Sequence, residues 1–399
     1  MSEEKQLAFE TRALHCDGHG KPMHAHVWPI FQTSSFVFDS PEHGRALFAG
    51  EQQGHIYSRL GNPTVEALEN TVKELEGGHA SFAFGSGMGA ITCSTMPFLH
   101  AGEHIIVGDT LYGCTVDLFH EHFHQYALEV TAVDTSSMDA IKSAWKPNTK
   151  MIYLETPANP TNKISDIGEI AKFAHERNAL VVVDGTFSSP YFLKPLKLGA
   201  DMALHSVTKY ISGHGDVVAG VLTVTTEDQA KICRGWRKVT GGLLGPQDAF
   251  LVLRGIRTLQ IRMERIQQTA LTLAKWLHDH PAIEKVNHPG LEDFPGHDIA
   301  MKQMSGVGGT FSFTMRGGYE AAKRLLEEVK ICTVCVSLGS VDTLIEHPAS
   351  MTHACVPEEL MIKQGLTKNM VRISVGLENV EDLKADLAQA LEKCEKPKA

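Results

Sequence analysis

The sequence lacks the features that would assign it to several classes of protein. No apolar run approaches the ~20 residues that a membrane-spanning helix needs, so we expect no membrane partner. The 37 basic and 47 acidic residues are interspersed, with a net charge of -10 and no basic stripe, so nucleic acid is not an expected partner. The polar N-terminal segment MSEEKQLAFETRALH contains no apolar signal-peptide core. We therefore expect a cytoplasmic protein.

Paired cysteines are also scarce. Of the eight cysteines, only Cys332 and Cys335 are closely spaced, and no second pair stands at the distance of a zinc ribbon. This scatter predicts buried free thiols in a reducing compartment, which agrees with a cytoplasmic location.

The chain changes character twice along its 399 residues, which are enough for two or three domains. Residues 1–60 have weak periodicity and predict an extended arm that lies on a neighbouring subunit. Residues 61–255 alternate helical stretches with short apolar runs, which predicts an α/β domain with a mostly parallel sheet. Residues 256–399 predict a smaller α+β domain that begins with a long helix over 256–280. Thr64 is expected to cap the first helix of the α/β domain. The runs interpreted as parallel strands are 105–107, 128–133, 151–154, 180–183, 202–204 and 217–224.

Polar residues stand where several of these strands end, at Glu155, Asp184 and Ser206. In α/β proteins the carboxyl ends of the strands form the ligand crevice. Lys209 follows the strand at 202–204 and is surrounded by hydroxyls and glycines. Our hypothesis is that Lys209 forms a Schiff base with an aldehyde cofactor; the ordinary alternative is a solvated surface lysine.

Three further features fit such a cofactor, although each has a structural alternative. The glycine-rich turn at 85–89 opens a helix, whose N-terminus can bind an anion or can simply be a tight helix start. Asp184 after a buried strand can hold a pyridinium nitrogen protonated, as pyridoxal phosphate requires, or can cap a helix. Tyr112 could stack on a cofactor, and Cys114 lies two residues on; both could equally be core residues.

One motif points to a different chemistry. His120, Glu121 and His124 match the H-E-x-x-H pattern of zinc hydrolases, but no third-ligand signature follows and the motif lies in the α/β region. A solvated histidine cluster is the preferred interpretation, with zinc hydrolysis as the alternative from another class. We expect no metal.

Taken together, these residues resemble the Cys/Met-metabolism family of pyridoxal-phosphate-dependent enzymes. The resemblance runs from about Phe9 to about Ala388. It rests on Tyr-Ser-Arg-Leu-Gly-Asn-Pro-Thr at 57–64, Ser-Gly-Met-Gly-Ala at 86–90, Glu-Thr-Pro-Ala-Asn-Pro-Thr at 155–161, Ser-Val-Thr-Lys-Tyr at 206–210, Gly-His-Gly-Asp at 213–216 and Val-Arg-Ile-Ser-Val-Gly-Leu-Glu at 371–378. It implies a fold-type I, PLP-dependent transferase-like α/β fold.

The resemblance also assigns roles to residues. Lys209 would carry the cofactor, Asp184 would pair with its ring nitrogen, and Tyr112 would stack on the ring, act as acid and base, and be favoured as phenolate by Arg59. The phosphate would be bound by Gly87, Met88, Ser206 and Thr208, with Tyr57 and Arg59 from a neighbouring subunit. The substrate would be bound by Arg372, Ser337, Asn159 and Cys114, with the Arg372 guanidinium clamping its carboxylate.

Within the family the chain is most similar to the methionine γ-lyase branch, mainly through Leu-Tyr-Gly-Cys-Thr at 111–115 and also through the segment 348–353. This implies α,γ-elimination of L-methionine to methanethiol, 2-oxobutanoate and ammonia, with homocysteine as a further substrate. The alternatives within the family are a cystathionine γ-lyase and an O-acylhomoserine sulfhydrylase; a non-enzymatic binding protein is disfavoured by the intact residue set. The expected assembly is a homotetramer, a dimer of dimers with active sites shared between subunits.

The sequence departs from the family pattern in two places. Gly185 stands where the family has asparagine after the cofactor-binding aspartate. Arg237-Lys238-Val239 replaces a Lys-Asp-Met segment, exchanging an acid for a base near the expected substrate mouth. The first departure removes the side chain after the cofactor-binding aspartate, and the second bears on substrate preference rather than on the chemistry.

Overall fold

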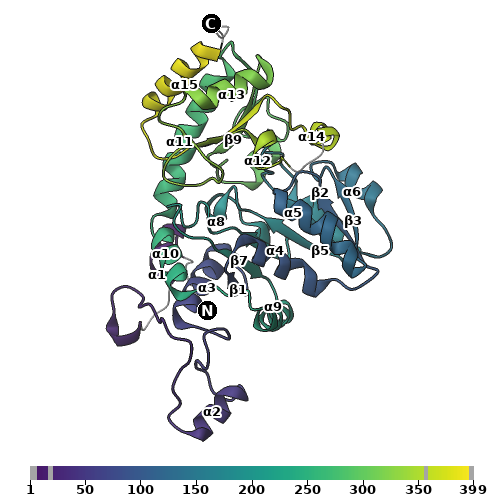
Figure 1. The fold of residues 1–399 in the computed structure, drawn as a ribbon. Helices are drawn as coiled ribbons and strands as arrows, with labels where there is room; N and C mark the ends of the chain where they lie inside the picture. The colour runs from purple at the N-terminus through teal and green to yellow at the C-terminus, as the bar shows by residue number, and fades with distance from the viewer. Residues whose placement is uncertain (1–6, 17–20, 355–357, 395–399) are drawn as a thin grey trace.

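The computed structural model describes residues 7–16, 21–354 and 358–394, so parts of the predicted arm (1–6, 17–20) and the tail 395–399 lie outside it. Two sheets organise these residues, a seven-stranded one in the middle of the molecule and a five-stranded one above it (Figure 1). The predicted α/β fold is confirmed. Nothing among the described helices combines the length and the apolar character needed to cross a membrane.

The central sheet has the strand order β1-β7-β6-β5-β4-β2-β3. Its strands are β1 (Ala80–Phe84), β2 (His104–Gly108), β3 (Glu129–Val133), β4 (Thr149–Glu155), β5 (Leu180–Asp184), β6 (Met202–His205) and β7 (Gly220–Val224). Strands β2 to β6 are parallel, as predicted. The run at 217–224 was predicted as parallel, and this is wrong, because β7 runs antiparallel to β6 and to β1. The link between β6 and β7 contains turns but no crossover helix, which a parallel connection would need. Strand β1 was not predicted.

Helices cover both faces of this sheet, which explains the continuous apolar runs in its inner strands β2, β4, β5 and β6. Val182 belongs to the apolar cluster that contains residues of α4 and α9, whereas Val181 and Val183 belong to the cluster that contains residues of α7. The apolar cluster that contains Val181 and Val183 continues into the second sheet, so the two sheets share one core. The helices up to this point in the chain are α1 (Phe9–His15), α2 (Pro41–Phe48), α3 (Pro63–Glu76), α4 (Gly87–Thr95), α5 (Gly113–Asp117), α6 (Met138–Ala144), α7 (Ile167–His175), α8 (Ser189–Phe192), α9 (Glu227–Thr240) and α10 (Pro246–Ile256).

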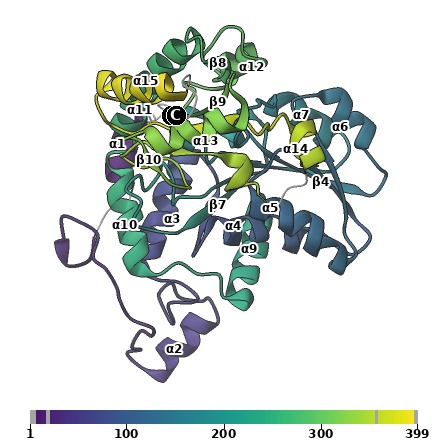
Figure 2. The same cartoon turned by 45° about the horizontal axis from the view of Figure 1, so that its top comes forward.

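The C-terminal part is an α+β layer of five strands in the order β10-β11-β12-β9-β8, covered by helices (Figures 1 and 2). Its elements are α11 (Leu259–His278), β8 (Ile283–Asn287), α12 (His297–Gln303), β9 (Thr310–Met315), α13 (Gly318–Glu328), β10 (Thr333–Val334), β11 (Leu344–Glu346), α14 (Glu358–Gln364), β12 (Met370–Ser374) and α15 (Val380–Cys394).

Two predicted helix starts are wrong. The helix expected over 256–280 is present as α11 (Leu259–His278), but it begins three residues later than predicted, because Ile256 is the last residue of α10. Arg262 stabilises the break between α10 and α11 by donating to the Gly255 carbonyl oxygen at 2.8 Å. Helix α3 is capped by Asn62, whose side chain accepts from the Thr64 N–H at 3.0 Å. Thr64 is buried instead and donates to the Pro29 carbonyl oxygen at 2.8 Å, which ties the arm to the helix.

The N-terminal arm extends away from both sheets and carries α2 at its far end (Figures 1 and 2). Among the described residues of the arm, an isolated β-bridge joins Ser35 and Tyr57. Tyr57 and Val37 are exposed there, as are other large apolar side chains. An apolar segment that packs so little against its own chain suits an inter-subunit contact.

Candidate active site

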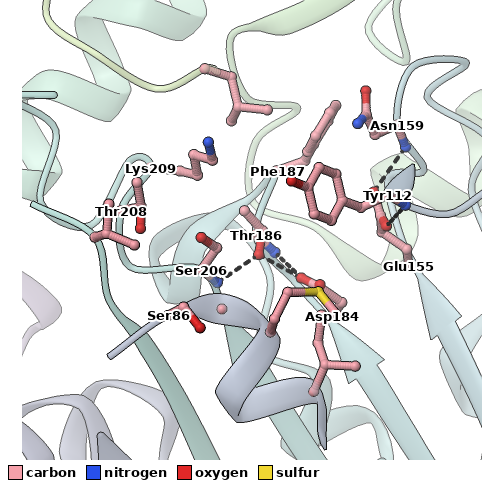
Figure 3. Close-up of a pocket in the computed structure, with 15 residues that line it drawn as sticks. Ser86, Tyr112, Glu155, Asn159, Asp184, Thr186, Phe187, Ser206, Thr208 and Lys209 are labelled. Carbon is pink, nitrogen blue, oxygen red and sulfur yellow. Dashed lines mark hydrogen bonds between the residues drawn. The ribbon is translucent and has the colours of Figure 1, made fainter. Parts of the chain in front are cut away.

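A pocket opens at the carboxyl ends of β4, β5 and β6, where α4 begins (Figure 3). This is the edge at which the sequence placed a ligand crevice. The structure brings eight of the predicted site residues to its lining: Gly87, Met88, Tyr112, Asn159, Asp184, Ser206, Thr208 and Lys209.

Lys209 points into this pocket from the turn after β6 (Figure 3). Its Nζ donates to Ser337 Oγ at 2.6 Å, and Ser337 has a left-handed φ of 88°. Burial, followed by the charge of Arg372, lowers the pKa of Lys209 to about 8. About a tenth of the amine is therefore neutral at pH 7, far more than for an ordinary lysine, and the neutral amine is the nucleophilic and basic form. The surface-lysine alternative is wrong.

Asp184 ends β5 and is buried. Thr186 donates to its Oδ1 from both the backbone N–H, at 2.9 Å, and the hydroxyl, at 2.5 Å. The Thr186 hydroxyl oxygen also accepts from the Ser206 N–H at 2.9 Å, so one threonine orients the acid against the next strand. Burial raises the pKa of Asp184, and the Thr186 bonds oppose that shift. A cation held beside this carboxylate would stabilise its charged form.

The glycine turn forms a narrow cradle between α4 and the turn after β6. Ser86 caps α4 by accepting from the Gly89 N–H at 3.1 Å. The first turn of α4 lines the pocket with Gly87 and Met88. A Cβ on Gly87 would lie 2.9 Å from Ser206 Cβ, so this approach requires glycine. The Thr208 hydroxyl, by contrast, already donates to the Ala219 carbonyl oxygen at 3.1 Å, so it would have to leave this acceptor to donate to an anion in the pocket.

Tyr112 precedes α5 and lines the pocket with its ring. The Cys114 thiol lies 3.6 Å from its hydroxyl, although Cys114 itself is not among the described lining residues. This contact, followed by burial, raises the pKa of Tyr112 to about 12. The expectation that Arg59 favours the phenolate finds no support within one chain, where Tyr112 is a neutral phenol.

Arg372 is buried behind the pocket rather than at its lining. It forms a salt bridge with Glu346 at 2.9 Å and donates to Asn159 Oδ1 at 3.1 Å. Its second nitrogen donates to the Ser337 carbonyl oxygen at 2.6 Å. Arg372 therefore connects Asn159 to Ser337, and Ser337 in turn accepts the hydrogen bond from Lys209.

Two predicted phosphate ligands lie elsewhere in this chain. Tyr57 and Arg59 belong to the arm, and neither is among the described residues that line the pocket. The guanidinium carbon of Arg59 lies 5.5 Å from the centre of the Tyr57 ring, and Arg59 donates to the Lys238 carbonyl oxygen at 2.6 Å. Their part in a phosphate site would need a second chain.

The unusual segment at the end of α9 does not face the pocket. Arg237 is buried and pairs with Glu69 under β1, while Lys238 and Val239 are exposed beside Arg59. Arg237 is therefore a structural partner of Glu69, and an effect of this segment on substrate preference stays a prediction.

The histidine cluster lacks the geometry of a zinc helix. His120 lies in a π-helical turn and His124 in the 3-10 turn that follows, and both are exposed with Glu121. Groups of three or more metal-binding side chains were not found within the described ranges. The zinc-hydrolase alternative therefore has no structural support.

Several site residues were missed at the sequence level. Glu155 was noted as a strand end without a role, yet it lines the pocket and accepts from the N–H groups of Tyr112 and Asn159. Thr186, Phe187, Leu338 and Glu346 were also missed. The Thr-Phe pair directly after Asp184 was an available signal for the first two, since a hydroxyl two residues after a strand-end acid commonly bonds to it.

These observations together test which ligand the pocket fits. It combines a buried lysine with a lowered pKa, a buried acid, an aromatic ring and a glycine cradle at a helix N-terminus. An aldehyde, a pyridine nitrogen, a flat ring and a phosphate are the matching groups, so the residues fit pyridoxal phosphate. The fold and site define a pyridoxal-phosphate-dependent enzyme.

Comparison with known proteins agrees with this class. The family model described as Cys/Met metabolism PLP-dependent enzyme matches residues 10–392, and the chain belongs to that family. An L-methionine gamma-lyase of Fusobacterium nucleatum subsp. polymorphum is 50% identical over 98% of this chain and 100% of its own. A cystathionine gamma-lyase of Bacillus subtilis (strain 168) is 44% identical over 91% of this chain and 93% of its own. The crystal structure of a cystathionine gamma-lyase from Lactobacillus plantarum in complex with L-serine superposes with a TM-score of 0.92, with 37% identity over 98% of this chain and 100% of that chain.

Proposed function

We propose that the protein is a methionine γ-lyase that converts L-methionine and water to methanethiol, 2-oxobutanoate and ammonia, and that also acts on homocysteine. The observation that carries the proposal is the Cys114 thiol 3.6 Å from the Tyr112 hydroxyl, which places a sulfur-compatible side chain beside the group that would protonate a leaving thiolate. Full-length relatives named L-methionine gamma-lyase, at 43% to 50% identity, support the same substrate.

In this proposal the residues divide the proton transfers among them. Pyridoxal phosphate supplies an aldehyde that takes the substrate amine and a ring that draws electrons from its α-carbon. Lys209, whose lowered pKa increases the fraction of neutral amine, removes the α-proton and then moves protons at the β-carbon. Tyr112, held as a neutral phenol by its raised pKa, donates its proton to the sulfur that leaves the γ-carbon.

The remaining pocket residues bind and orient. Asp184, fixed by Thr186, would keep the ring nitrogen protonated. The N–H groups of Gly87 and Met88 at the start of α4, with the Ser206 and Thr208 hydroxyls as donors, would hold the phosphate, for which Thr208 would give up its bond to the Ala219 carbonyl oxygen. Arg372, Ser337 and Asn159 would hold the substrate carboxylate, and Cys114 would line the thioether pocket.

We further propose a cytoplasmic homotetramer, a dimer of dimers, in which Tyr57 and Arg59 reach the phosphate of a neighbouring subunit. The projecting arm supports this assembly, because both residues lie on it and outside their own pocket. The proposed division is an arm over 1–60, a cofactor-binding domain over 61–255 and a C-terminal domain over 256–399. Mixing a Tyr57→Phe, Arg59→Ala chain with a Lys209→Ala chain tests the sharing: hybrid dimers should regain one wild-type site, whereas absence of recovery would exclude it.

A substrate panel tests the proposed activity. The purified protein with pyridoxal phosphate should release methanethiol and 2-oxobutanoate from L-methionine, and 2-oxobutanoate from homocysteine. Cystathionine γ-lyase activity is the alternative that the Bacillus relative favours, and an O-succinylhomoserine sulfhydrylase of Pseudomonas aeruginosa is a 38% identical relative. Faster cleavage of cystathionine than of methionine, or faster exchange of an O-acylhomoserine with sulfide, would replace the proposal with the corresponding alternative.

A further inference from the structure

Glu155 is a pocket carboxyl group to which the proposed reaction assigns no task. It ends β4 and pairs in register with Asp184 at the end of β5. Strands in parallel register turn such residues to the same side of the sheet, and both carboxyl groups line the pocket.

The two oxygens of Glu155 accept from two different loops. The Tyr112 N–H donates to Oε2 at 3.0 Å, and the Asn159 N–H donates to Oε1 at 3.0 Å. Figure 3 shows both bonds converging on this one side chain. The residues that donate are 47 positions apart in the chain, so a single carboxyl group spans loops that follow different strands.

Each of these loops carries a part of the site. The first carries the Tyr112 ring at the pocket. The second carries the Asn159 side chain, whose Oδ1 accepts from Arg372 at 3.1 Å. The position of the Tyr112 hydroxyl relative to the Asn159–Arg372 contact therefore depends on the side chain of Glu155.

A glutamate at position 155 is energetically unfavourable, because its carboxyl group is buried beside that of Asp184, and packing alone does not explain why this position has an acid. Burial and the neighbouring Asp184 raise the pKa of Glu155 to about 8, while the two N–H bonds oppose that shift. A neutral or apolar side chain would avoid the unfavourable burial of a second acid. An apolar one, however, would leave two backbone donors without an acceptor, and an amide would offer only one acceptor oxygen.

We propose that Glu155 is a positioning residue whose carboxyl group fixes the Tyr112 loop against the Asn159 loop, and so sets the acid–base hydroxyl relative to the substrate-carboxylate site. The catalytic part of this inference rests on the proposed function, whereas the loop-fixing part concerns the chain alone. Glu155→Gln is the informative variant, because it has nearly the same shape and keeps one acceptor oxygen of the two.

The chain offers a matched control. Asp386 is another buried carboxylate that accepts from backbone N–H groups, those of Lys330 at 2.7 Å, Ile331 at 2.8 Å and Cys332 at 3.0 Å. It lies in the C-terminal domain on α15. Asp386→Asn removes a comparable set of bonds away from the pocket.

Hydrogen exchange of the apoprotein tests the loop contacts without any activity. In the unaltered apoprotein the amides of Tyr112 and Asn159 should be protected. Glu155→Gln should accelerate exchange at one or both of them about tenfold, the loss expected for one hydrogen bond. Asp386→Asn should leave both unchanged. Unprotected amides in the unaltered protein, or unchanged protection in Glu155→Gln, would overturn the proposal. The measurement on the unaltered protein needs no variant, so it tests the proposal even if every variant fails to fold.

Kinetics and the spectrum of the bound cofactor test the consequence. Per mole of bound pyridoxal phosphate, Glu155→Gln should lower kcat at least tenfold and raise KM for the amino acid, with an altered visible circular dichroism band. Glu155→Asp keeps two acceptor oxygens on a shorter side chain. Relative to Glu155→Gln, it should restore part of the exchange protection and a smaller part of kcat. Asp386→Asn should change thermal stability and neither constant. Wild-type kcat, KM and dichroism in Glu155→Gln would exclude positioning. Failure of the unaltered enzyme to release methanethiol would instead refute the proposed function and leave the exchange result standing.

Discussion

Glu346 and Arg372 lie side by side on neighbouring antiparallel strands, β11 and β12, and form a buried salt bridge of 2.9 Å. Burial raises the pKa of Glu346 and lowers that of Arg372, and each charge opposes the shift of the other. The guanidinium that would clamp the substrate is thus held in place by an acid that contacts no substrate in this account.

Removing the acid should therefore be costly to the fold. Glu346→Gln leaves Arg372 as a poorly compensated buried cation, and we expect the free energy of unfolding to fall by roughly 3–5 kcal/mol. Urea denaturation of the apoprotein measures this. The exposed pair of Lys231 and Asp228 provides the control, since Asp228→Asn should leave stability almost unchanged. An unaltered midpoint in Glu346→Gln would contradict the assigned pairing.

The lowered pKa of Lys209 predicts the pH dependence of cofactor uptake. The neutral amine attacks an aldehyde, and with a pKa of about 8 its fraction rises from pH 6 and levels off above pH 9. The rate of covalent uptake of pyridoxal phosphate by the apoprotein should follow that curve, measured by the appearance of its visible absorbance. Lys209→Arg should show no covalent uptake at any pH. A half-maximal rate above pH 10, the value of an ordinary lysine, would show that the amine is not desolvated as described.

Arg237 and Cys114 should have separable effects. Arg237→Ala leaves the buried Glu69 carboxylate without its partner, so stability should fall while the rate ratios among methionine, homocysteine and cystathionine stay constant. Cys114→Ala should preserve stability and turnover but change those ratios. Denaturation and a competition assay with paired substrates distinguish the two. Altered ratios in Arg237→Ala, or unaltered ratios in Cys114→Ala, would reverse the assignment.

Gly185 leaves space for a buried ring behind the cofactor-binding acid. A Cβ at this position would lie 2.9 Å from the ring carbon Cε1 of His205, which pairs with Glu76 in the core. Gly185→Asn should therefore displace His205 and lower stability by about 1–3 kcal/mol, the usual range for overpacking. Thermal denaturation with Gly168→Ala as a control tests this, because a Cβ at Gly168 meets its nearest neighbour only at 3.5 Å. A neutral Gly185→Asn would show that the His205 ring moves freely.

The sequence was sufficient to predict the elements whose signals are local. Lys209 and Asp184 were found because Asp184 ends one apolar strand and Lys209 lies in the turn after another, and parallel strand ends meet at one edge of a sheet. The glycine turn before α4 was recognisable for the same reason. Family resemblance then connected these sites with Tyr112 and Arg372, whose roles no local pattern defines.

What the sequence could not predict depends on pairing between distant segments. The partnership of Glu346 with Arg372 requires two short strands to lie antiparallel, and no pattern within either strand shows which strand it pairs with. The direction of β7 depends on a connection that contains no helix. Strand β1 could be recognised only from its pairing with β7. Asn62 rather than Thr64 caps helix α3, because the Thr64 hydroxyl is bonded to the Pro29 carbonyl oxygen in the arm.

The most direct test of the central claim is the turnover of L-methionine by Lys209→Ala, compared with the unaltered enzyme under saturating pyridoxal phosphate. Lys209 is expected to be both the attachment point and the base at the α-carbon, so methanethiol and 2-oxobutanoate should fall by at least a thousandfold, consistent with the ~10²–10⁴ contributed by a positioned base. The variant should remain folded, with the thermal midpoint of its apoprotein close to that of the unaltered chain. Release of both products at the wild-type rate would contradict the account.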